Sequence, residues 1–293
     1  MIRTALVAAA ILAMAAPAAA APAKGKAAPA PAAPPAAPGD PKASDWRIPN
    51  PEDVLVIDTS KGRIFVEMIP DVAPTHVARI REVARSGVYD GRKFFRVIDQ
   101  FMAQTGDPVD NGTGGTDKPD LTQEFLFRRG PQTPMVLAAD QAVSQVGFLK
   151  SLPIMSQSAM LMAMTADGKI SAWPLYCPGV AGMARGEAEN SANSQFFFMR
   201  QAYPSLEKRY TAWGRVIAGL EAVRAIKVGE PPADPQDTMD KVRVLADIPA
   251  AERPSVRVID PNSAWFKAEI ESVRAAKGAD FTACAIRIPS EVK

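Results

Sequence analysis

Short runs of β-branched and aromatic residues, each followed by a turn signal, recur along the chain from residue 54 onward. The segment VLVIDTSKGRIFVEM (54–68) contains two such runs around a Ser-Lys-Gly turn, which predicts a β-hairpin. The same pattern predicts further short strands within 88–108, 122–127, 196–199, 210–218 and 241–249. This density of short strands constrains the fold more than any other feature of the sequence.

Helical periodicity occurs in only two segments between these strands. Pro74 suits the first position of a helix whose apolar residues share one face, and Ser86 and Gly87 predict its end. A shorter helix is predicted after a turn at Gly219. Many strands with two helices predict a mainly β fold, in which an antiparallel sheet closes into a barrel and the helices cap its ends.

The overall composition is that of an ordinary globular protein. Of 293 residues, 47% are hydrophobic and 23% are charged, which is enough for one large core or two smaller ones. The formal net charge is only +2, and this argues against a nucleic-acid-binding surface.

Residues 1–20 have the layout of a secretory signal peptide. Arg3 precedes an apolar run from Ala5 to about Ala16, and Ala18 and Ala20 offer an Ala-x-Ala cleavage site. The run is shorter than the ~20 residues that span a bilayer, so cleavage is favoured over an uncleaved anchor. The prediction is a periplasmic protein with no stable membrane insertion after signal cleavage.

Residues 21–50 are predicted to form an Ala/Pro-rich linker. Between residues 21 and 40, nine residues are Ala and six are Pro, and none is β-branched or aromatic. Such a segment has little to bury that would offset its chain entropy. We interpret it as a tether.

The chain contains two cysteines, Cys177 and Cys284, and one histidine, His76. In an oxidising compartment the cysteines could form a disulfide, although two buried free thiols fit the sequence equally well. Neither their spacing nor a single histidine suits a zinc site, so we expect no metal and no other cofactor. His76 falls in the first turn of the first predicted helix, and we interpret it as a surface or cap-proximal residue rather than a catalytic base.

Three motifs occur in a characteristic order. FFRVIDQFMAQTGDP (94–108) places an arginine among aromatic residues with no nucleophile beside it, GTGG (112–115) follows, and MARGEAENSANSQFFF (183–198) comes last. Together they resemble the cyclophilin family of peptidyl-prolyl cis-trans isomerases, and most of all its exported bacterial members. The resemblance covers about 54–248, so we assign the isomerase domain to 51–249. It implies an eight-stranded closed antiparallel barrel with two capping helices.

The chemistry of this family accounts for an arginine without a nucleophile. Rotation about an X-Pro bond is opposed by amide resonance, with a barrier of ~18–20 kcal/mol, and no covalent bond has to break. A hydrogen-bond donor aimed at the prolyl nitrogen, inside a dry apolar pocket, would weaken that resonance as the bond twists. Arginine is always charged and presents its donors in a rigid fork, so it needs no pH-tuned base.

The resemblance also implies which residues form the site. Arg96 corresponds to the donor, and Gln104 to the glutamine that holds this arginine and a substrate carbonyl. The residues that match the family's substrate-binding groove are Phe101, Met102, Ala184, Arg185, Gln195, Phe197, Leu206 and Tyr210. Two positions depart from the family, because Phe95 and Tyr210 stand where histidine is common.

Three other phenylalanines near these motifs are predicted to lie in the core. Alternate residues of a strand face opposite ways. Phe94, Phe196 and Phe198 therefore belong to the interior of the barrel rather than to the site.

Two segments lie outside the family pattern. Residues from about 129 to 178 form a large insertion containing SAMLMAM (158–164), which we interpret as a core strand, with a flexible client-binding flap as the alternative. Residues 250–293 form a C-terminal α/β extension, with a helix within 260–278 and a strand within 281–289. We expect the insertion and the extension to pack together, and a Cys177–Cys284 disulfide could pin them.

The leading functional hypothesis is a monomeric peptidyl-prolyl isomerase that assists the folding of exported proteins. Its partners would be unfolded or flexible polypeptides that contain proline. The alternative is a catalytically weak cyclophilin-like chaperone or proline-binding module, which a groove covered by the insertion would favour. A hydrolase ranks third, because the single histidine has no accompanying catalytic motif.

Overall fold

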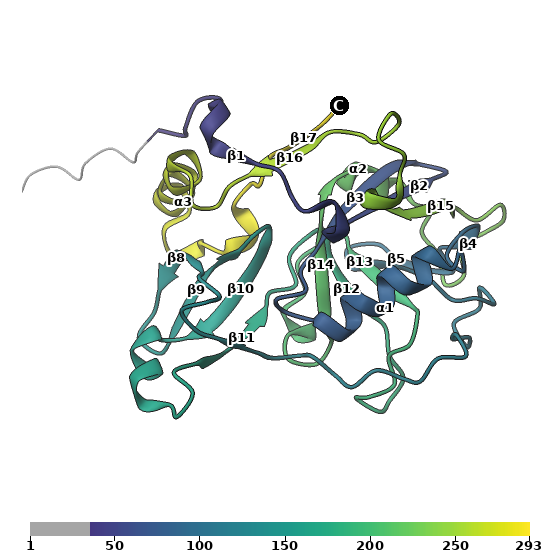
Figure 1. The fold of residues 1–293 in the computed structure, drawn as a ribbon, viewed down its shortest axis with the longest axis horizontal. Coiled ribbons are helices and arrows are strands. Elements are labelled where there is room, and N and C mark those ends of the chain that lie inside the picture. Colours follow the sequence, from purple (N-terminus) through teal and green to yellow (C-terminus); the bar gives the residue numbers. More distant parts are fainter. Residues whose placement is uncertain (1–35) are drawn as a thin grey trace, which may run out of the picture. The chain divides into compact units, whose positions relative to one another are not determined.

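A computed structural model of the chain describes residues 36–293, so the predicted signal peptide and the first part of the predicted linker lie outside the described residues. The strands of this region form three sheets, all with antiparallel pairing (Figure 1). They have nine, five and three strands, respectively. The prediction of a mainly β protein is confirmed.

The largest sheet carries the predicted motifs. In spatial order its strands are β4 (Arg92–Lys93), β15 (Thr238–Val244), β2 (Val54–Thr59), β3 (Gly62–Met68), β14 (Ala212–Ala218), β12 (Val180–Met183), β13 (Phe196–Met199), β6 (Met102–Thr105) and β5 (Arg96–Ile98). The predicted hairpin is β2–β3. The prediction of a closed eight-stranded barrel is wrong, because the sheet is a curled half-barrel of nine strands. Its end strands β4 and β5 follow each other along the chain instead of pairing.

Two helices pack against this sheet, as predicted. Helix α1 (Pro74–Arg85) contacts β15 and β14, and the short helix α2 (Leu220–Ala225) contacts β3. Gly87 and Gly219, which follow α1 and precede α2, have φ angles of +75° and +87°, which only glycine adopts at little cost. The turn signals therefore located both helices.

The first turn of α1 is capped by a residue distant in sequence. The N-cap residue Ala73 has no side chain that could accept a hydrogen bond, but the Glu124 carboxylate accepts from the backbone N–H groups of Thr75 and His76. His76 Nδ1 lies 2.7 Å from the same carboxylate. The interpretation of His76 as a cap-proximal residue is therefore confirmed. Its interpretation as a surface residue is wrong, because the side chain is fully buried.

These contacts predict a pH-dependent contribution to stability. Burial raises the pKa of Glu124, but the bonds from His76 and from the two backbone N–H groups outweigh burial, so the pKa lies below its ordinary value. The contribution is therefore present above the unfolded pKa of about 4.5 and is lost as the pH falls through the lower folded value. We expect Glu124→Gln to cost about 1–2 kcal/mol at pH 7 and progressively less below pH 4.5.

Urea denaturation at several pH values measures this difference. Glu221→Gln, which removes an exposed carboxylate from the first turn of α2, is the matched control and should cost far less at pH 7. A Glu124→Gln cost that did not change with pH would contradict the assignment.

The segment predicted as an insertion forms the second sheet. Its strand order is β7 (Phe127–Arg129), β11 (Ile170–Pro174), β10 (Leu152–Gln157), β9 (Ser144–Leu149) and β8 (Val136–Asp140). Two strand predictions were wrong here. TQEFLF is mostly irregular, with a strand beginning only at Phe127, and SAMLMAM contains a 3₁₀ helix (Ala159–Met164) whose Met160 and Met164 are about 80% exposed. A run of apolar residues without alternation does not distinguish these states.

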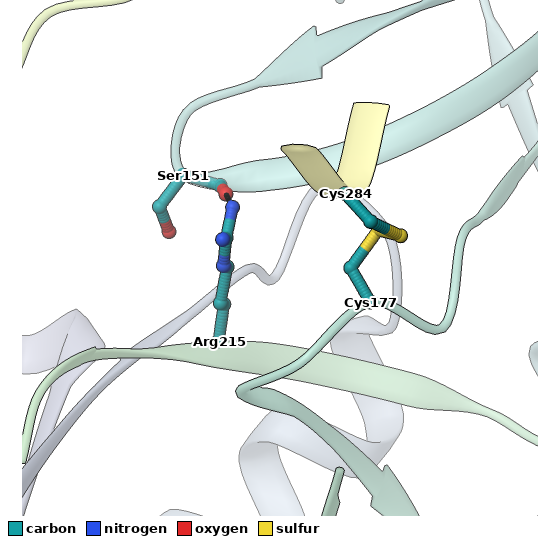
Figure 2. Close-up of a disulfide and its surroundings, with 4 residues drawn as sticks. All are labelled: Ser151, Cys177, Arg215 and Cys284. Carbon is teal, nitrogen blue, oxygen red and sulfur yellow. Dashed lines mark hydrogen bonds between the residues drawn. A yellow bond between two sulfur atoms is a disulfide. The ribbon is translucent and has the colours of Figure 1, made fainter. Parts of the chain in front are cut away.

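The C-terminal residues add helix α3 (Ala264–Lys277) and the small sheet β1 (Trp46–Arg47), β16 (Val256–Ile259) and β17 (Ser290–Val292). The helix is confirmed, but the predicted strand within 281–289 is wrong, because this segment is irregular apart from a short 3₁₀ helix (Ala283–Ala285) and precedes β17. Phe266 of α3 packs edge-on against Phe148 of β9, with ring centroids 5.1 Å apart. A disulfide joins Cys177 to Cys284 (Figure 2). The insertion and the extension do pack together.

Among residues 36–293, no helix is both long enough and apolar enough to cross a membrane.

Candidate functional site

Three adjacent strands place Arg96, Gln104 and Phe197 in one row across the large sheet. Arg96 of β5 is paired with Gln104 of β6, and Gln104 is paired with Phe197 of β13. Residues directly opposite each other in antiparallel strands have their side chains on the same face. The row is therefore a consequence of strand register.

The neighbouring residues of β13 face the other way. Phe196 and Phe198 are fully buried in the main core, together with Phe94. The prediction that these three phenylalanines are core residues is confirmed. Phe197 packs instead in a second cluster with Met102 and Leu206.

A pocket of about 200 Å³ lies on the Phe197 face of the sheet. Its lining residues are Arg96, Phe101, Met102, Gln104, Ala184, Arg185, Phe197, Leu206 and Tyr210. A second cavity of about 150 Å³ shares Gln104, Ala184 and Arg185 with it and is also lined by Gln195. All ten predicted site residues border these two cavities.

A chain of hydrogen bonds connects the polar residues of the row to a loop. Arg96 Nη1 lies 3.4 Å from Gln104 Oε1, and Gln104 Nε2 donates to Gln195 Oε1 at 3.0 Å. Gln195 Nε2 in turn donates to the carbonyl oxygens of Gly112 and Gly114. The GTGG motif thus holds Gln195, which orients the amide of Gln104.

The guanidinium of Arg96 is not in a dry environment, contrary to the prediction. Its side chain is 41% exposed, and its Nε donates to Glu230 Oε2 at 2.7 Å. Glu230 lies in the loop between α2 and β15 and is itself half-exposed. In the free protein the arginine is therefore solvated on one side.

The insertion supports one wall of the pocket without lining it. Trp173 of β11 donates from Nε1 to Glu207 at 3.3 Å, and Lys208 Nζ lies 3.7 Å from the centre of the Trp173 ring. Burial raises the pKa of the Glu207 carboxyl, although the Trp173 bond and Lys208 oppose this.

A second contact from the insertion lies behind the pocket, where Tyr176 stacks on Phe197 with ring centroids 6.1 Å apart. These contacts hold the loop that carries Leu206 and Tyr210.

The side chain of Arg185 contributes more than the sequence indicated. Its guanidinium lies 4.6 Å from the centre of the Tyr210 ring and donates to the carbonyl oxygens of Arg209, Gly186 and Glu187. Arg185 and Tyr210 are thus fixed to each other by a cation–π contact at the pocket edge.

Sequence reasoning missed Glu230, Trp173 and Tyr176. Glu230 follows α2 in a proline-rich loop and lies 134 residues from Arg96 along the chain, with no periodic signal. Trp173 and Tyr176 fall in the insertion, for which the family pattern gave no correspondence. Within residues 36–293, no group of three or more His, Cys, Asp and Glu side chains is arranged to hold a metal ion.

Comparison with known proteins shows the family to which the chain belongs. The family model described as cyclophilin type peptidyl-prolyl cis-trans isomerase/CLD matches residues 54–246. A "Probable peptidyl-prolyl cis-trans isomerase" of Brucella suis is 34% identical over 191 residues, which cover 61% of this chain and 74% of that protein. The isomerase CYP71 of Arabidopsis thaliana is 30% identical over 179 residues, covering 60% of this chain and 21% of that protein.

A solved structure extends the similarity beyond the isomerase domain. The crystal structure of cyclophilin AquaCyp293 from Hirschia baltica superposes with a TM-score of 0.77 and 33% identity, covering 84% of this chain and 93% of that one. The superposed 84% of this chain is longer than the segment 54–246 that the family model matches, so part of the structural similarity lies outside that segment. The chain belongs to the cyclophilin-type peptidyl-prolyl cis-trans isomerases, and its activity is the cis-trans isomerisation of X-Pro peptide bonds.

Proposed function

We propose that Arg96 performs this isomerisation by donating a hydrogen bond to the prolyl nitrogen as the X-Pro bond twists. The observation that supports this role is the row of Arg96, Gln104 and Phe197, which sets a fixed cation beside an apolar pocket. As the nitrogen loses resonance with the carbonyl, its lone pair becomes an acceptor, and a donor waiting at that point stabilises the twisted state more than the planar one.

The proline ring would occupy the apolar end of the pocket, between Phe101, Met102, Phe197 and Leu206. The residues before proline would lie along Gln195 and the Ala184–Arg185 backbone, toward the adjoining cavity. A peptide in this position would displace water from Arg96. Because electrostatic interactions are stronger in a site without water, substrate binding would itself complete the catalytic environment.

A catalytically weak chaperone or binding module is the second candidate. It is favoured by the ion pair with Glu230, which occupies one side of Arg96 in the free protein. Against it, the pocket is lined by residues from 96–104 and 184–210, so the insertion leaves the groove open. The rate of isomerisation of a short proline peptide, measured for the unmodified chain and for Arg96→Ala, decides between the enzyme and the binding module.

We further propose that the enzyme is monomeric and acts on exported polypeptides in the periplasm. The periplasmic part of this proposal rests on the signal-peptide pattern of residues 1–20 and on the Cys177–Cys284 disulfide, because disulfides persist mainly in oxidising compartments.

Expression of the full chain in a Gram-negative bacterium tests export. We expect the protein in the periplasmic fraction, with Ala21 as its N-terminal residue by mass spectrometry. Deletion of residues 2–20 is the control and should leave the protein in the cytoplasm with reduced cysteines. Full-length protein in the cytoplasm from the unmodified chain would contradict the proposal.

A further inference from the structure

A cavity of about 310 Å³ lies away from the isomerase pocket, where β14, α2 and the C-terminal segment meet. Three arginines line it, and each comes from a different part of the chain: Arg215 from β14, Arg224 from α2 and Arg287 from the segment before β17. Ser151 and Cys284 line the same cavity. Figure 2 shows Arg215 extending from its strand toward the turn that carries Ser151, with the disulfide nearby.

Arg215 has little to compensate its charge. Its Nη1 donates to the backbone carbonyl of Ser151 at 3.0 Å, and no ion pair joins it to any acid among residues 36–293. Burial lowers the pKa of this guanidinium to about 10, which reflects the cost of removing the cation from water. Arg215 is half-buried, and charges withdrawn from water are ordinarily paired, so an unpaired one next to a cavity calls for a partner.

The nearest candidate acid is already occupied. Glu67 lies directly opposite Arg215 in the β3–β14 register. Its two carboxylate oxygens accept from the guanidinium of Arg47, and one of them also accepts from the backbone N–H of Ser151. Glu67 is therefore neutralised by Arg47, and Arg215 remains an excess positive charge.

The other polar groups of the cavity leave the same imbalance. The exposed side chain of Arg224 has no acidic partner among the described residues, while Arg287 donates twice to Glu269. The hydroxyl of Ser151 is buried and makes no hydrogen bond within residues 36–293. Arg215 and Arg224 thus border the cavity without an anionic acceptor, whereas the Ser151 hydroxyl is enclosed by protein.

We propose that this cavity binds an oxyanion with at least two negative charges, such as phosphate or a small di- or tricarboxylate. The planar guanidinium groups of Arg215 and Arg224 match the geometry of such oxygens in pairs. The ligand would lie between the isomerase domain and the C-terminal extension, and would therefore contact both.

Isothermal titration of the full mature chain with inorganic phosphate and with citrate tests the proposal. Ionic strength is held constant with sodium chloride, so that general screening does not contribute. We expect saturable binding of at least one probe with a Kd of about 1 mM or lower. The phosphate and citrate titrations distinguish the two ligand chemistries.

Variants locate the site. Arg224→Gln removes an exposed side chain that makes no ion pair, so it should fold normally and weaken binding by at least about tenfold. Arg215→Gln should weaken binding at least as much. If Arg215→Gln does not fold, the affinity of Arg224→Gln alone decides the test. Arg274→Gln on α3, an exposed arginine outside the cavity, is the matched control and should bind as the unmodified chain does.

Two results would overturn the proposal. One is the failure of both phosphate and citrate to bind saturably at constant ionic strength. The other is equal affinity in Arg224→Gln and Arg274→Gln, since this would place the bound anion elsewhere on the surface.

Discussion

Replacing Arg96 with alanine is expected to lower kcat/KM for a short proline peptide by about 10²–10³-fold, the usual effect of removing a preorganised donor from a transition state. Most of the loss should appear in kcat, because the apolar pocket formed by Phe101, Met102, Phe197 and Leu206 remains to bind the proline. A protease-coupled assay that detects the trans form of the peptide measures this rate.

Two further variants make the experiment specific. Arg96→Lys keeps the positive charge but loses the rigid fork, so its rate should fall between those of the unmodified chain and Arg96→Ala. Arg128→Ala removes an exposed arginine that pairs with Asp167 in the insertion, and it should leave the rate unchanged. Equal rates for Arg96→Ala and the unmodified chain would contradict the proposed role and favour the weak binding module.

Removing the disulfide is expected to give the largest loss of stability. The Cys177→Ser/Cys284→Ser double variant should be about 3–5 kcal/mol less stable, because the bond closes a loop with a sequence separation of 107 and so restricts the unfolded chain. For a domain of this size, the corresponding decrease in Tm is roughly 10 °C.

Thermal denaturation with and without reductant measures the effect. The unmodified chain should lose stability when reduced, and the double variant should not respond to reductant. Isomerase activity at 25 °C should survive in both, because the pocket residues lie in 96–104 and 184–210. A difference below about 1 kcal/mol would show that the insertion and the extension are held together by packing, such as the Phe148–Phe266 contact.

Several structural features were not predictable from local patterns. A nine-stranded open ladder and a closed eight-stranded barrel have the same alternation in each strand, and they differ only in which strands pair. The methionines of SAMLMAM were predicted to lie in the core, yet Met160 and Met164 are exposed. An apolar run does not specify which other residues cover it. The strand expected within 281–289 was misplaced to the N-terminal side of β17 for a similar reason, since a short apolar run fits several local conformations.

The sequence by itself determined the alternation that separates Phe197 from Phe196 and Phe198 and both ends of helix α1, and it indicated ten of the residues that border the pocket and the adjoining cavity. These depend on periods of two and 3.6 residues and on motifs, which are local properties of the chain. The tertiary structure alone decided that Glu230 pairs with Arg96, that Trp173 and Tyr176 support the pocket, and that Arg215 borders a cavity to which residues 36–293 contribute no acidic side chain. Those contacts join residues far apart in sequence, and their geometry exists only once the sheets have packed.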